Sequence, residues 1–134
     1  MDGVAAIRYL LANNAPVVAL VPAARISAGD LPQGVTLPAI SVDLISGIDR
    51  NIIEPGTTRH VTERVQVTCF ASTYPALKAL QQAVKRACAD TFPTVTGIQN
   101  VVVHSENQGP DFRDEANSIR MGTQDFRVSY TQTI

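Results

Sequence analysis

The chain has 134 residues, of which 45% are hydrophobic, 17% charged and only 5% aromatic, and the 11 Lys and Arg against 12 Asp and Glu leave a formal net charge of −1. This length predicts a single globular domain over residues 1–134 that buries its core without disulfides or metals. The charge balance excludes a strongly basic nucleic-acid-binding protein, and no apolar run is long enough to cross a membrane. Because so few residues are charged, we expect part of the surface to be covered by copies of the chain or by partners.

Two cysteines and one apolar segment bear on the compartment of synthesis. Cys69 and Cys88 lie in apolar stretches, which predicts buried free thiols and a reducing compartment such as the cytosol. The apolar segment 15–24 is interrupted by Pro16 and Pro22 and follows an acidic rather than a basic start. We therefore do not expect it to be a signal peptide.

The first half of the chain predicts one helix and two main strands. Apolar residues on one helical face predict a helix over Asp2–Ala12. Arg25–Ser27 has the character of a short strand, and a turn-rich loop follows it. Alternating apolar and polar residues then predict half-buried strands over Ala39–Ile45 and Val61–Phe70, with Glu63 interrupting the inward side of the second strand.

The second half repeats this order of helix, strand and strand. Capping residues, an early proline and a 3.6-residue apolar period predict a helix over Tyr74–Asp90. Alternation predicts strands around Val101–His104 and Phe126–Thr131, the last one beginning as early as Ile119. The sequence therefore predicts an α+β fold with a four-stranded antiparallel sheet of two long-loop hairpins, and with the N-terminal helix and the central amphipathic helix packed on one face.

The residues offer no constellation for catalysis or for cofactor or metal binding. His60 and His104 are not at a metal-binding spacing, and no context supports a nucleophile and base pair of Cys69 with either of them. The glycines form no phosphate-binding loop. The acidic residues of 111–115 lack the spacing of a calcium loop. We therefore expect no catalytic residue, no cofactor and no metal site.

Two long inter-strand loops, predicted over Ser46–His60 and Ser105–Ser118, concentrate the charge and are the first places to seek function. The charged residues of the first sum to zero, and those between Ser105 and Arg120 sum to −2. The mixed loop suits salt-bridged contact with another subunit, whereas the acidic loop would repel a phosphate backbone.

Two motifs carry a resemblance to a known family. The first is R-I-S at Arg25–Ser27 with L-P-Q-G and then L-P-A-I ending at Ile40, and the second is R-V-Q-V-T-C-F-A-S-T-Y at Arg64–Tyr74 followed by A-L-K-A-L. With the closing Asp125–Val128, these segments resemble the tail-completion, or tail terminator, family of long-tailed phages and gene transfer agents. The resemblance runs from the first helix to the final strand and is weakest over residues 47–60.

This resemblance implies a non-enzymatic virion protein of the tail or neck, assembled in the host cytoplasm. Members of the family form a homo-oligomeric ring, a hexamer, that caps the tail tube, stops its polymerisation and offers a docking surface for the head connector. The implied partners are the tail tube protein and a head-tail connector or head-completion protein, with DNA passing through the lumen without specific binding and with no membrane. Contacts of the head-to-tail kind within a ring bury two different patches of each subunit, which suits a chain with few charges.

The resemblance and the charge count together give two hypotheses about residues. One group is expected to reach a neighbouring subunit or the tube: Asp49, Arg50, Glu54 and Arg59. The other is expected to line the lumen as an acidic loop: Asp111, Asp114 and Glu115. The alternatives are another neck or tail component of similar fold, such as a head-completion or tube protein, and a small hydrolase or transferase using Cys69 or His104.

Overall fold

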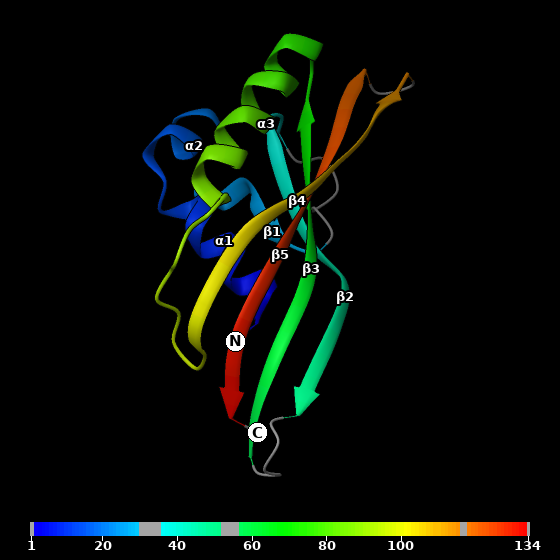
Figure 1. Ribbon diagram of the computed structural model, residues 1–134. Coiled ribbons are helices and arrows are strands. Elements are labelled where there is room, and N and C mark those ends of the chain that lie inside the picture. Colours follow the sequence, from blue (N-terminus) through cyan, green and yellow to red (C-terminus); the bar gives the residue numbers. More distant parts are fainter. Residues whose placement is uncertain (1, 30–35, 52–56, 116–117, 134) are drawn as a thin grey trace.

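A computed structural model describes residues 2–29, 36–51, 57–115 and 118–133 of the chain (Figure 1). In chain order the elements are α1 (Gly3–Ala12), α2 (Ala15–Leu20), a 3₁₀ turn (Ala23–Arg25), β1 (Ile26–Ala28), β2 (Ala39–Asn51), β3 (Thr58–Ala71), α3 (Tyr74–Cys88), β4 (Gln99–Asp114) and β5 (Ile119–Thr133). The helices lie on one side of the sheet, as predicted, and no described helix covers its other side (Figure 1).

The sheet has five strands in the order β1-β2-β3-β5-β4 and is mixed rather than antiparallel. β1 pairs with β2 in parallel, with Ile26 opposite Ile40 and Ala28 opposite Val42, and every other pairing is antiparallel. The prediction of a four-stranded antiparallel sheet was therefore wrong in strand number and in type. A three-residue strand has too little pattern for its partner to be inferred from the sequence.

Local sequence explains where the first helix begins and ends. The carboxylate of Asp2 accepts a hydrogen bond of 2.9 Å from the Ala5 N–H and caps the helix. At the other end, the Asn13 N–H bonds to the Tyr9 carbonyl and Asn14 caps the next helix. The helix buries Ile7 and Leu11 completely, so the predicted apolar face is the packed one.

The predicted central helix is confirmed as α3. The Thr73 hydroxyl accepts a hydrogen bond of 3.3 Å from the Ala76 N–H, and Pro75 stands in the first turn, where its missing N–H has no intrahelical partner to lose. The helix ends at Cys88, two residues before the predicted end. Ala89 has an extended backbone, and Asp90 has a positive φ of 54°, which an α-helix cannot accommodate.

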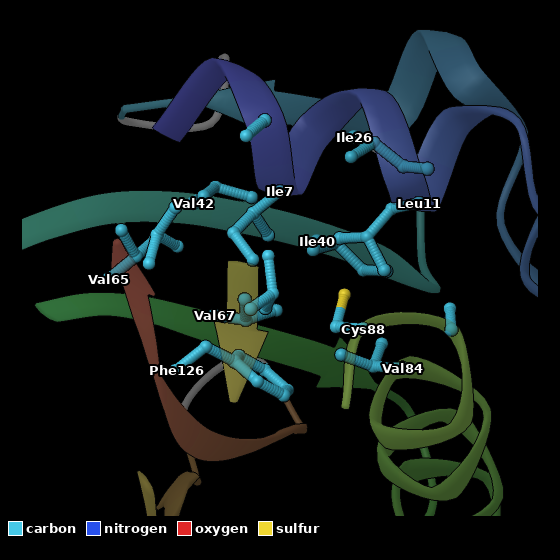
Figure 2. Close-up of a cluster of buried hydrophobic side chains, with 14 of the residues drawn as sticks. Ile7, Leu11, Ile26, Ile40, Val42, Val65, Val67, Val84, Cys88 and Phe126 are labelled. Atoms are coloured by element: carbon cyan, nitrogen blue, oxygen red, sulfur yellow. The ribbon is translucent and has the colours of Figure 1, made fainter. Parts of the chain in front are cut away.

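The core lies between these two helices and the covered side of the sheet (Figure 2). Apolar side chains from α1, α3, β1, β2, β3 and β5 meet there and are almost fully excluded from water. The labelled members are Ile7, Leu11, Val84, Cys88, Ile26, Ile40, Val42, Val65, Val67 and Phe126.

The two predicted long loops are in fact mostly strand. β2 and β3 continue as a β2–β3 arm (residues 44–51 and 58–65), and β4 and β5 continue as a β4–β5 arm (residues 105–114 and 119–126). The two arms leave opposite ends of the sheet (Figure 1). Their polar residues resemble loop residues because antiparallel pairing satisfies the backbone without burying the side chains. Shifts of register between Leu44 and Ser46, and at three places in β4, break the alternation on which the strand predictions depended.

Candidate assembly surfaces

The uncovered face of the sheet is polar and carries two ion pairs. The guanidinium of Arg64 donates to the Asp125 carboxylate, with the Nε–Oδ2 bond at 2.9 Å, and Arg127 lies 3.7 Å from a Glu106 carboxylate oxygen. Oppositely charged residues on adjacent strands thus neutralise each other across this face. The face therefore has the character of a solvated or loosely covered surface.

A shallow hollow of about 520 Å³ lies on this face and brings the two histidines together. His60 comes from β3 and His104 from β4, and Arg127 stands in the same lining. The Nδ1 atom of His104 lies 3.1 Å from an Asp90 carboxylate oxygen. Within the described part of the chain, no three His, Cys, Asp or Glu side chains are grouped closely enough to hold a metal ion.

Cys69 lies on the covered side of β3, so it does not meet either histidine. Its thiol is fully buried, and burial raises its pKa well above the usual value. Burial also raises the pKa of the Cys88 thiol to about 12. Both cysteines are therefore inert core side chains, and the described residues contain no nucleophile and base pair of the kind a hydrolase or transferase would need.

The residues expected to reach a neighbouring subunit belong to the β2–β3 arm. Asp49 and Arg50 are consecutive residues near the end of β2. Arg59, near the start of β3, donates a hydrogen bond of 3.1 Å to the Thr58 carbonyl. Glu54 lies outside the described residues. The described members of this group therefore lie at neighbouring positions at the far end of the arm.

The acidic residues expected to line a lumen lie at the far end of the β4–β5 arm. Asp111 accepts hydrogen bonds from the Tyr74 hydroxyl at 3.1 Å and from the Lys78 ammonium at 2.9 Å, so it is attached to α3. Asp114 is at the last position of β4, and Glu115 follows it with a carboxylate oxygen 3.8 Å from Arg113. Counting the paired Lys78, the −2 charge of residues 105–120 falls to −1.

The pair of Lys78 and Asp111 shifts the pKa of both partners. The hydrogen bond from Lys78 lowers the pKa of the Asp111 carboxyl, and the same bond raises the pKa of the Lys78 ammonium. Asp111 therefore contributes stability above its unfolded pKa of about 4 that is lost as the pH falls through the lower folded value, and Lys78 contributes stability below about pH 10 that is lost as the pH rises further. The pair is stabilising between these limits.

We expect Asp111→Asn to lower the free energy of unfolding by less than about 1 kcal/mol at pH 7, because both side chains are partly exposed. Urea unfolding of the variant and the wild type should show this difference shrink as the pH falls toward 3. Lys85→Gln, an exposed change on the same helix, is the control. An equal loss of stability in the control would contradict a specific role for the pair.

No role was predicted for Glu63, which lies under the start of α1. Its carboxylate is buried, accepts a hydrogen bond of 3.0 Å from the Gly3 N–H and also accepts one from the Tyr130 hydroxyl. Burial, together with this bond, raises the pKa of Tyr130. A negative charge at a helix N-terminus is stabilised by the helix dipole. The only signal in the sequence was the interrupted alternation at this position.

Exposed apolar side chains on the sheet edges also escaped prediction. On β2, Leu44, Ile45 and Ile48 are 51%, 49% and 59% exposed, and Phe92, in the connection before β4, is 76% exposed. Such side chains are typical of surfaces that other proteins cover. An α+β fold with exposed apolar edges is typical of a protein of the structural, assembling class.

Comparison with known proteins identifies the family. The sequence model of the family described as "Tail completion protein gp17" matches residues 5–131, so the chain belongs to this family. It is a structural, non-enzymatic component of the virion tail or neck. No curated protein matches it significantly by sequence.

A solved structure shares this fold. A chain from the structure titled "Virion of native gene transfer agent (GTA) particle" matches with a TM-score of 0.69 and 17% identity, covering 96% of this chain and 93% of that one. No described helix has the length and apolar character needed to span a bilayer.

Proposed function

We propose that the chain assembles into a homo-oligomeric ring, a hexamer, that caps the tail tube, ends its polymerisation and presents a docking surface for the head connector. The observation that carries this proposal is the position of the two arms, which leave opposite ends of one sheet (Figure 1). A ring on a tube needs one surface for contact with the tube or the next subunit and another for its lumen, and the two arms offer separate surfaces for these roles. Membership of the tail completion family supports the same function.

The charged residues of the arms are given different roles within this proposal. We assign the β2–β3 arm, with Asp49, Arg50 and Arg59, to contact with a neighbouring subunit or with the tube, and Glu54 between its strands to the same contact. We assign Asp114 and Glu115, on the β4–β5 arm, to the lumen. We assign Asp111 to the lumen as well. It lies on the same arm, and its bonds to Tyr74 and Lys78 attach this arm to α3. A weakly negative lumen would let DNA pass without gripping the phosphate backbone.

Deletion of the gene tests the proposed function. Electron microscopy of the resulting particles should show headless tails whose tubes vary in length, because nothing stops tube polymerisation. Supplying the wild-type chain in trans should restore uniform tails joined to heads, and native mass spectrometry of the released protein should give six copies of 14.4 kDa.

Two other outcomes would contradict the proposal and favour a different component of the tail or neck. Complete loss of tubes would favour a tube protein. Tails of normal length that fail to join filled heads would favour a head-completion protein.

A further inference from the structure

Two uncharged apolar surfaces lie on opposite lateral edges of the sheet. The first, the β2 edge patch, consists of the exposed Leu44, Ile45 and Ile48 along the edge of β2, with Leu44 opposite Val65 on the helix side of the sheet and Ile48 opposite Thr62 on the other face. The second, the Phe92 hollow, is a shallow concavity of about 520 Å³ beside the start of β4, with Phe92, Ile98 and other uncharged residues in its lining. In Figure 1 the connection that carries Phe92 and the strand β2 flank the sheet on its two sides. The chain thus carries a protruding apolar patch on one side and an apolar concavity on the other.

The register of the sheet places these two surfaces at the same level along the strands. Ile48 lies opposite Thr62 in β3, and Thr62 lies opposite Ser129 in β5. Ser129 in turn lies opposite Val102 in β4, and Val102 lines the Phe92 hollow. One row of paired residues therefore runs across the sheet from the β2 edge patch to the Phe92 hollow.

The edge of β2 is also open for contact at this level. β1 covers the outer edge of β2 only opposite Ile40 to Val42. Among the described residues, no strand pairs with that edge from Leu44 onward. Exposed edges with apolar side chains are normally covered, because they otherwise invite uncontrolled association.

We propose that the β2 edge patch of one copy seats in the Phe92 hollow of the next copy, and that this contact repeats around the ring. The inference rests on the proposed function and deepens it by naming the subunit contact. Two different patches that fit each other on opposite edges make a head-to-tail contact, which generates a ring when the rotation closes. Because both surfaces lie in one row of the sheet, the contact needs little displacement along the strands, and this favours a closed ring over a helical filament.

The occupant of the Phe92 hollow is a second copy of this chain, because the chain itself carries an exposed apolar patch that an apolar concavity can accommodate. No charged residue lines the Phe92 hollow, and Arg127, which lines the histidine hollow together with Ile48, is paired with Glu106, so the contact buries apolar area without leaving that charge unpaired. Pairing two β2 edge patches about a two-fold axis would leave both Phe92 hollows open. Only the head-to-tail contact covers both surfaces in every subunit.

Cross-linking in assembled particles tests this contact. Particles are prepared with the double variant Ile48→Cys, Phe92→Cys, treated with a short bismaleimide and denatured for gel electrophoresis. The native thiols give little background, since Cys69 and Cys88 are buried and have raised pKa values. We expect most of the chain to move into a ladder of covalent multimers, whereas each single variant stays a monomer.

The matched control is the double variant Leu20→Cys, Phe92→Cys. Leu20 is another exposed aliphatic residue, but it lies on α2 and outside both surfaces, so we expect no ladder. Self-cross-linking of the single Ile48→Cys variant, or a double variant that stays monomeric although several copies are in each particle, would overturn the contact and leave the ring standing. Particles that hold one copy or none of the wild-type chain would instead overturn the proposed function.

A second pair of variants gives an independent result. Ile48→Asp places a charge in the contact and should reduce incorporation into particles at least tenfold, whereas Leu20→Asp should leave it unchanged. Both sites are exposed, so circular dichroism should show that both variants fold. Incorporation of the Ile48→Asp variant at the wild-type level would overturn the proposal.

Discussion

Phe126→Ala is expected to lower the free energy of unfolding by about 3–5 kcal/mol, the usual cost of removing a fully buried aromatic ring. Phe126 is 1% exposed and lies on β5 among the side chains of the core (Figure 2). The loss combines the transfer of the ring from the core to water with the cavity left behind. Urea unfolding monitored by circular dichroism measures it.

The matched control for this change is Phe112→Ala. Phe112 lies on the β4–β5 arm and is half exposed, so its removal should cost less than about 1 kcal/mol. Similar losses for both variants would show that the ring of Phe126 does not belong to the cooperative core.

Glu63→Ala is expected to be the second most costly change, at about 3 kcal/mol, because it leaves two buried donors without an acceptor. These donors are the Gly3 N–H at the start of α1 and the Tyr130 hydroxyl on β5. Glu63→Gln keeps an acceptor of nearly the same shape but loses the charge that favours a helix N-terminus, and it should cost about half as much. Chemical denaturation of the two variants measures both losses.

A double-mutant cycle with Tyr130→Phe separates this network from simple loss of packing. The variant Glu63→Gln, Tyr130→Phe should lose less than the sum of the single changes, since each removes part of the same interaction. Strict additivity would contradict a direct bond between the two side chains. Glu115→Gln, an exposed carboxylate on the β4–β5 arm, is the control and should be nearly neutral.

The helices and the core were predictable because their signals are local. The apolar period of α3 and its Thr73 cap depend only on neighbouring residues, and the structure confirms both. The parallel pairing of β1 was not predictable, because it joins Ile26 to Ile40 across a turn-rich segment whose path the sequence leaves open. The sequence predicts loops where the arms lie, because each bulge shifts the alternation of apolar and polar residues by one position.

The candidate surfaces show the same division between local and long-range information. The charged segments can be read from the sequence, but their partners cannot. The ion pair of Asp111 with Lys78 depends on the packing of β4 beside α3, which no local pattern predicts. Likewise, Ile48 and Val102 are more than fifty positions apart in the chain, and only the pairing of four strands puts them in one row. Burial patterns cannot reveal such a row, because they describe each strand by itself.

The pairing of β3 with β5 gives the molecule a fixed length. These strands pair from Thr58 and Thr133 to Ala71 and Arg120 without a shift of register, so the ladder runs unbroken from one arm to the other. At roughly 3.3 Å per residue, fourteen paired positions span about 45 Å. The number of paired residues in this ladder therefore sets the distance between the two ends of the molecule, and with it the separation of any partners bound there. Adding two residues to both β3 and β5 would lengthen this ladder. Because side chains alternate between the faces with a period of two, every side chain would stay on its own face of the sheet.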